Sequence, residues 1–252
     1  MLAAGWPAIT FFQPKGDTVF RRIASLAVVG LALLGAACSD DDSSNGNGPG
    51  NNAFVRVVHA SPDAPNVDVL VDGQTVLTDV QYKQFSGYLS VPKGLHNIKV
   101  NVTGGGATVI NADVDLAAGA YYTAIASDFA ATITPLVLLD DLSAPVAGSA
   151  KVRLVHTAAS AGLVDIYVTT PNADISGVAP NVANFDFQDE TGYIELPAGN
   201  YQVRVTAAGT KTVAIDTGTL PLASGYIATA LAVDAPGGGT PFGVLLMEDT
   251  TD

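Results

Sequence analysis

Hydrophobic and polar residues alternate with a period of two along several short stretches of this chain. In the first of them, residues 54–59, Val55 and Val57 share one face while Arg56 lies on the other. The same alternation returns at residues 152–156. A period of two is typical of a strand with one buried face, because successive side chains point to opposite sides of the sheet. We therefore predict strands here, with their arginines on the outer face.

These two stretches belong to a long internal repeat. VRVVHASPDAPNVDVLVDG (residues 55–73) is echoed by VRLVHTAASAGLVDIYV (residues 152–168), with equivalent residues 97 positions apart. Further on, SGYLSVPKG (residues 86–94) returns as TGYIELPAG (residues 191–199), now 105 positions apart. A repeat unit of roughly 100 residues is a whole small domain and can form a core of its own. The sequence thus predicts two tandem domains.

The rest of the pattern is that of an all-β protein. Short apolar stretches are separated by turn residues, including glycine triplets at residues 104–106 and 237–239, and no helical periodicity interrupts them. We predict two tandem antiparallel β-sandwich domains, either immunoglobulin-like or transthyretin-like. The first covers residues 54–142 and the second residues 151–252, with a short linker at residues 143–150.

Residues 1–37 have the features of a secretory signal peptide. Arg21 and Arg22 precede an uncharged run of 15 residues, Ile23 to Ala37, which is too short to span a bilayer comfortably and ends in small residues. Such a signal does not need residues 1–18. We interpret those residues as a start site placed too early or as an extension of the signal.

Cys38, the only cysteine, follows this run directly. LLGAAC resembles a bacterial lipoprotein processing site, at which the cysteine becomes the acylated first residue. The polar, acidic and glycine-rich stretch at residues 38–53 predicts a disordered tether, because it has no apolar surface to bury. Ser39 beside the cysteine resembles outer-membrane sorting, and Asp40–Asp42 resembles an acidic signal for export to the cell surface. A merely solvating linker explains this acidic run more simply. The alternative is ordinary cleavage after Ala37, with an incidental cysteine.

Composition and charge narrow the class of protein further. Charged residues make up 14% of the chain and only three residues are Glu, whereas helical surfaces are usually rich in Glu, Lys and Arg. The formal net charge of −13 repels nucleic acid and anionic lipid headgroups. We therefore expect no nucleic-acid partner, and membrane attachment only through a lipid on Cys38.

Two histidines and two aspartates recur at equivalent positions of the repeat. His59 ends a predicted strand and Asp68 opens the next, and His156 and Asp165 do the same in the second copy. We interpret each pair as a structural clasp in which the histidine hydrogen-bonds the aspartate. A partly buried pair of this kind stabilises a domain without taking part in chemistry.

The turn SPDAP after the first histidine is a candidate binding loop, because its two prolines fix φ and restrict the residues before them. The residues concerned are Ser61, Pro62, Asp63 and Pro65. An alternative hypothesis is a hydrolase with His59 as base and Ser61 as nucleophile, acting in the loop that also holds Asp63. The second copy has Ala158 in place of that serine, so the two copies cannot share this chemistry. The second copy instead has eight additional residues, placed in the loop TTPNADISGVAPNVANF.

Other catalytic and metal-binding patterns are missing from the sequence. It contains no GxSxG, HExxH or calcium-loop motif. We predict no catalytic residues, no metal site, and no cofactor beyond the diacylglycerol and acyl chains on Cys38. Asp113 with Asp115, and Asp140 with Asp141, could supply oxygen ligands to Ca²⁺. Solvated strand ends explain these pairs more simply.

The repeat also resembles a known family. VRVVHASPDAPNVDVLVDG followed by GYLSVPKGLHNIKV is similar to the bacterial family catalogued as domain of unknown function 4397. The resemblance extends as two copies over residues 54–249, although the second copy lacks the prolines and the aspartate of SPDAP. It implies an extracytoplasmic β-sandwich module, often in tandem, with no established chemistry and no catalytic residues.

Together these features predict an exported protein of the bacterial cell envelope, anchored by lipid at the outer membrane or the cell surface. We expect its two modules to bind or scaffold a partner, either a protein or a glycan. An envelope hydrolase and a purely structural spacer are the alternatives.

Overall fold

Residues 50–250 are described by a computed structural model, and all the regular structure in that range is β-strand. Within it no helix is long and apolar enough to cross a membrane. The strands of the first module are β1 (Asn52–His59), β2 (Val67–Val71), β3 (Gln74–Val80), β4 (Leu89–Pro92), β5 (Gly94–Val102), β6 (Thr108–Leu116), β7 (Tyr121–Ser127) and β8 (Thr134–Asp140). The strands of the second module are β9 (Ser149–His156), β10 (Val164–Thr169), β11 (Val182–Phe185), β12 (Glu190–Pro197), β13 (Gly199–Ala207), β14 (Val213–Asp216), β15 (Leu220–Leu222), β16 (Ile227–Val233) and β17 (Gly243–Glu248).

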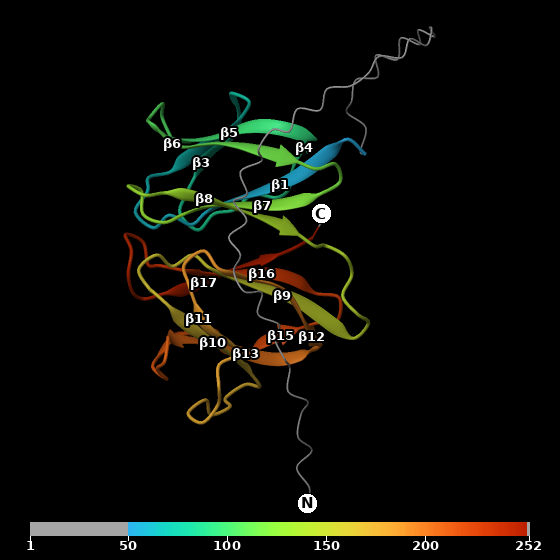
Figure 1. The fold of residues 1–252 in the computed structure, drawn as a ribbon, viewed down its shortest axis with the longest axis vertical. Helices are drawn as coiled ribbons and strands as arrows, with labels where there is room; N and C mark the ends of the chain where they lie inside the picture. The colour runs from blue at the N-terminus through green and yellow to red at the C-terminus, as the bar shows by residue number, and fades with distance from the viewer. Residues whose placement is uncertain (1–49, 251–252) are drawn as a thin grey trace, which may run out of the picture. The chain divides into compact units, whose positions relative to one another are not determined.

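Each module is built from two sheets (Figure 1). In the first module, sheet A has the order β4-β1-β7-β8 and sheet B the order β3-β2-β5-β6. In the second, sheet C has the order β12-β9-β16-β17, and sheet D the order β11-β10-β13-β14 with β15 also paired to β13. Sheet C therefore repeats sheet A, and sheet D repeats sheet B. The prediction of an all-β chain with two tandem sandwiches is confirmed.

One feature departs from a purely antiparallel arrangement. β1 pairs in parallel with β7, and β9 pairs in parallel with β16, while the other paired strands run antiparallel. The strand boundaries also shorten two predicted irregular segments. β1 begins at Asn52, inside the predicted tether, and β9 begins at Ser149, inside the predicted linker. The signal peptide, Cys38 and most of the tether lie outside the described residues.

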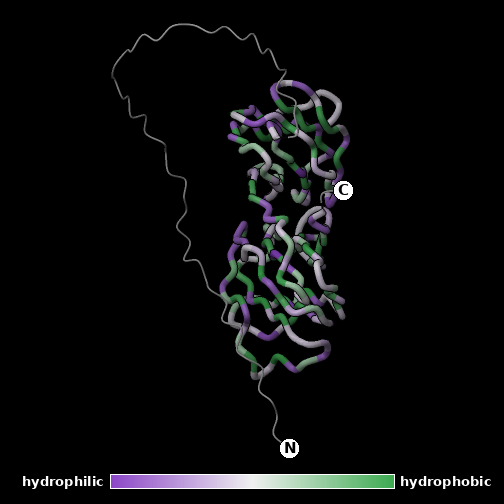
Figure 2. The backbone as a smooth tube through the Cα atoms, turned by 90° about the vertical axis from the view of Figure 1, so that its right-hand side faces the viewer, coloured by the Kyte–Doolittle hydropathy of each residue, from purple (hydrophilic) through white to green (hydrophobic). Residues whose placement is uncertain are grey.

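The buried apolar residues form three cores rather than two. Figure 2 shows hydrophobic and hydrophilic residues following one another along the backbone. One core lies between sheets A and B and includes Val55 and Val57 of β1. A second lies between sheets C and D and includes Ile166 of β10. The third joins the modules through the outer faces of sheets A and C. Its main members are Val58, Ile125 and Leu138 from the first module, and Val155, Leu231 and Met247 from the second.

The arginines predicted on the outer face do lie on that side, but the face is not exposed. Arg56 is 2% exposed and Arg153 is 1% exposed. The reason is that sheet A and sheet C cover one another. The two modules are thus parts of one compact unit within residues 47–252.

Candidate functional site

The predicted hydrogen bonds between histidine and aspartate are not formed. His59 instead closes the turn that follows its own strand: its Nε2 lies 3.1 Å from the Pro65 carbonyl oxygen, and its Nδ1 lies 3.3 Å from the Ser61 amide nitrogen. His156 does the same, with Nε2 2.9 Å from the Gly162 carbonyl oxygen. This geometry fits a neutral ring that donates through Nε2 and accepts at Nδ1. Burial lowers the pKa of both imidazoles, partly offset by the bond to the carbonyl.

The two aspartates act separately from the histidines. Asp68 accepts a hydrogen bond of 2.9 Å from the Asp79 amide, and Asp165 accepts one of 2.9 Å from the Asn184 amide. Asp165 also accepts a bond of 2.8 Å from the Gly209 amide. The recurrence of these residues therefore reflects two independent local clasps in each module. The His–Asp pairing inferred from the repeat was wrong because the two side chains belong to different sheets.

The SPDAP turn is partly buried: Ser61 and Pro62 are buried, whereas Asp63 and Pro65 are exposed. Ser61 is fully buried, and its Oγ has no hydrogen-bond partner among the described residues. The Asp63 carboxylate accepts a bond of 2.7 Å from the Ala130 amide, and so stabilises a neighbouring loop. The Pro62 carbonyl accepts a bond of 2.7 Å from the Gly237 amide of the second module. The turn thus contacts the second module through Pro62, and Ser61 does not hydrogen-bond a base as the hydrolase hypothesis requires.

The second glycine triplet explains part of this contact. Gly238 has a φ of +98°, and a Cβ atom added there would lie 2.7 Å from the ring of Phe129 in the first module. A side chain at this position would clash, so the close approach of the two loops requires glycine.

A buried cluster of charges lies at the centre of the interface between modules. Arg56 of β1 forms an ion pair of 2.6 Å with Asp249, directly after β17 of the other module. Arg153 of β9 forms the reciprocal pair of 2.5 Å with Asp140, at the end of β8. Arg56 also lies 4.0 Å from Asp140. Two cations and two anions therefore neutralise one another in a site without solvent.

Hydroxyl groups at equivalent positions of the two modules complete this cluster. Tyr88 and Thr123 donate hydrogen bonds to Asp140, and Tyr193 and Thr229 donate hydrogen bonds to Asp249, at 2.6–2.7 Å. The tyrosine rings lie under the guanidinium groups, with Arg56 5.0 Å from the ring centre of Tyr88. Burial, followed by the nearby aspartate, raises the pKa of that phenol. The eight side chains thus form one satisfied network related by approximate two-fold symmetry.

Sequence reasoning missed this network, and it treated Asp140 as a solvated strand end or a Ca²⁺ ligand. Asp140 is 6% exposed and paired with arginine, so neither interpretation holds. Its neighbour Asp141 pairs with Lys151 instead. The available signal was that Arg, Tyr, Thr and Asp all recur at equivalent positions of the two copies. Within residues 50–250 no group of three or more His, Cys, Asp or Glu side chains could hold a metal ion.

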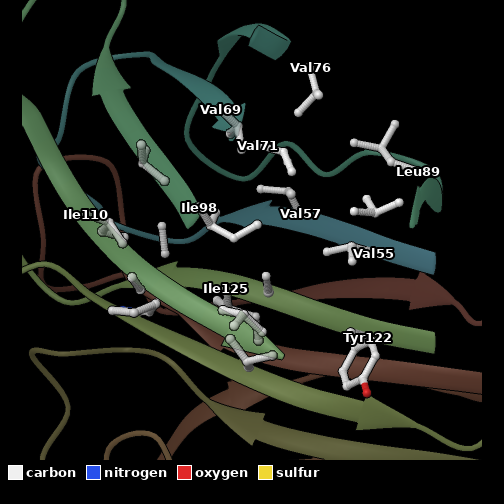
Figure 3. Close-up of a pocket in the computed structure, with 18 of the residues that line it drawn as sticks. Val55, Val57, Val69, Val71, Val76, Leu89, Ile98, Ile110, Tyr122 and Ile125 are labelled. Atoms are coloured by element: carbon white, nitrogen blue, oxygen red, sulfur yellow. The ribbon is translucent and has the colours of Figure 1, made fainter. Parts of the chain in front are cut away.

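The first module contains an apolar cavity between sheets A and B (Figure 3). The cavity volume is about 60 Å³, and side chains from both sheets point into it. Nine of the lining residues are valines. Two lining residues also reach solvent: Val76 of β3 is 40% exposed and Val137 of β8 is 39% exposed. Tyr122 lies at one end, and its hydroxyl already accepts a hydrogen bond from the Ala117 amide.

The outer faces of sheets B and D differ in what covers them. In the second module, the predicted distinctive loop folds over sheet D: Lys211 bonds the Tyr167 hydroxyl and the Val178 carbonyl, and Arg204 bonds the Ala173 carbonyl at 2.6 Å. As a result Tyr167 is only 1% exposed. The end of the predicted loop is regular, since its last four residues form β11.

The equivalent face of sheet B carries polar side chains that reach solvent. Asn111, Asp113 and Asp115 of β6 are exposed. Asn97 of β5 donates hydrogen bonds of 2.9 Å to Asn111 and 2.8 Å to Asp113. These bonds hold the amide and carboxylate groups in a fixed row across the sheet.

Comparison with known structures yields distant likenesses. An α-glucan-binding streptococcal virulence factor is 13% identical, over 71% of this chain and 92% of that one, with a TM-score of 0.26. A family 26 carbohydrate-binding module of Amy13K from Eubacterium rectale, solved with maltoheptaose, is 11% identical, over 79% and 98%, with a TM-score of 0.22. No functional argument follows from scores of this size. No curated protein sequence matches this chain.

A family profile, by contrast, matches most of the chain. The matching segments are residues 53–167 and 168–252. Their common boundary falls inside β10, whereas the sheets change between β8 and β9, so we place the division between modules where the strand pairing changes. Because the profile matches two adjacent segments that together span most of the chain, this chain belongs to the family described as Domain of unknown function (DUF4397).

Proposed function

We propose that this chain is a binding protein of the bacterial cell envelope, in which the first module binds a polar partner through the outer face of sheet B. The second module and the buried interface serve as the scaffold. The partner is a protein or a glycan, since both are recognised by fixed rows of amide and carboxylate groups. The observation that carries the proposal is the difference between equivalent faces, one covered by the chain's own loop and the other free to bind.

The interface between modules supports the scaffolding part of the proposal. A buried, fully paired charge network fixes orientation because any rotation would separate charges that solvent cannot reach. A partner bound to sheet B is then held at a constant distance and angle from the second module. Independent modules on a flexible linker would not provide this.

The position in the cell is part of the same proposal. A signal peptide over residues 1–37 and acylation of Cys38 would deliver the two modules to the outer membrane or to the cell surface. The tether that follows the cysteine would let them reach partners beyond the lipid headgroups.

Affinity capture with the purified mature protein tests the binding role. The bait is exposed to envelope extract and to a panel of envelope glycans, and bound material is quantified. The double variant Asn111→Ala/Asp113→Ala should reduce capture at least tenfold. The matched control is Asp216→Ala, because Asp216 occupies the equivalent position of sheet D. It lies opposite Arg204 in the strand register, as Asn111 lies opposite Lys99 in sheet B.

Two outcomes would contradict the proposal. If the double variant captures as much as the parent, or the control loses capture equally, sheet B is not the binding face. If the parent captures nothing above a denatured sample, the spacer hypothesis replaces it.

A further inference from the structure

The lining of the cavity in the first module differs in side-chain size from the equivalent region of the second. Tyr122 and Ile98 are larger than their counterparts Ala228 and Val203. Three other lining residues, Val57, Val69 and Val91, are smaller than theirs. The equivalent residues of the repeat are Leu154, Ile166 and Leu196, each larger by one methylene group. Register confirms the correspondence: Val69 pairs with Val100 as Ile166 pairs with Val205, and Ala53 pairs with Val91 as Ala150 pairs with Leu196.

The chemistry of the lining restricts the class of ligand. Carbon atoms form nearly all of the cavity surface, and the lining includes no charged side chain. The hydroxyl of Tyr122 is already engaged with a backbone amide. A sugar, nucleotide or ion placed here would lose its hydration without gaining hydrogen bonds, which makes such ligands unfavourable. Only a hydrocarbon group fits these surroundings.

The shape of the cavity selects among hydrocarbons. A volume of about 60 Å³ corresponds to roughly four water-sized spheres. This is too little for a fused ring system, but it accommodates a run of several methylene groups between the sheets. The remainder of the molecule would leave through the edge of the sandwich, beside the half-exposed Val76 or Val137. A polar head group would then stay in water.

We propose that this cavity is a binding site for the unbranched alkyl chain of a fatty acid. The site is independent of the polar face of sheet B, so it adds a second ligand to the same module. A fatty acid matches both parts of the geometry, because its tail is apolar and narrow and its carboxylate remains outside. Each additional buried methylene should increase affinity about fourfold until the cavity is filled.

Titration of the full-length Cys38→Ala protein with saturated fatty acids of four to twelve carbons, followed by calorimetry, tests the site. Affinity should rise with chain length and then level off. The variant Val57→Leu/Val69→Ile/Val91→Leu, which copies the second module, should weaken dodecanoate binding at least tenfold and retain or raise the melting temperature. The reverse variant Leu154→Val/Ile166→Val/Leu196→Val leaves the first module unchanged, so the site there should keep the parent's affinity for dodecanoate. Any additional binding should come from the space that the variant opens in the second module.

A second variant distinguishes loss of the cavity from misfolding of the core. Val137→Arg at the half-exposed edge of β8 should also weaken binding without disturbing the fold. The proposal is overturned if the parent binds no dodecanoate, or if both the filled variant and Val137→Arg bind it as the parent does. Capture of a polar partner by sheet B would be unaffected in these cases, so the two proposals fail separately.

Discussion

Removal of Asp249 tests whether the buried charge cluster holds the modules together. Asp249→Ala would leave the Arg56 guanidinium, which is 2% exposed, without its partner at 2.6 Å. It would also leave the hydroxyls of Tyr193 and Thr229 without an acceptor. Breaking a buried ion pair by removing one member typically costs about 3–5 kcal/mol. Asp140 still lies 4.0 Å from Arg56 and compensates in part, so we expect a loss near 3 kcal/mol.

Equilibrium denaturation of the mature protein measures this loss. For a folded unit of this size, about 3 kcal/mol corresponds to a decrease in melting temperature of roughly 6–12 °C. The control is Asp141→Ala, since its ion pair with Lys151 involves a carboxylate side chain that is 59% exposed. An exposed pair contributes less than about 1 kcal/mol. The parent should unfold in one transition because the third core and the charge cluster join the modules.

A double variant separates loss of the pair from loss of packing. Arg56→Met/Asp249→Leu replaces two charges by apolar groups and leaves no unpaired cation. It should be less destabilised than Asp249→Ala alone. If Asp249→Ala is no more harmful than Asp141→Ala, or if the double variant is as unstable as the sum of its single changes, the cluster does not stabilise the interface.

Two further predictions concern the histidines and the cysteine. Burial holds the pKa of His59 and His156 below the ordinary value of 6.5, so the unfolded chain binds protons that the folded chain does not. The contribution of these histidines to stability is therefore present above pH 6.5 and is lost as the pH falls through their lower pKa in the folded state. His156→Gln should flatten the dependence of the unfolding free energy on pH between 8 and 5. An unchanged slope would contradict this. Mass spectrometry of membrane-extracted protein should find an acylated Cys38 at the amino terminus, whereas an unmodified thiol there would exclude the lipid anchor.

The amino-acid sequence by itself determined the repeat, the strands and the sandwich class. Alternation with a period of two is a local property, so the inward position of Val55 and the outward position of Arg56 could be predicted without a structure. Glycine triplets and prolines predicted the turns, because their preference for turn conformations is also a local property. The two strand pairs that run parallel were not predicted, because alternation contains no information about strand direction.

Only the tertiary structure decided what covers each face and which polar groups meet. Alternation distinguishes the two sides of a strand, but it does not reveal whether the outer side faces water or another module. Arg56 and Asp249 are separated by nearly 200 residues, and their contact depends on the packing of sheet A against sheet C. His59 and Asp68, only nine residues apart, are separated because one ends a strand of sheet A and the other lies in sheet B. Proximity along the chain suggested a pair, and the division of neighbouring strands between two sheets prevented it.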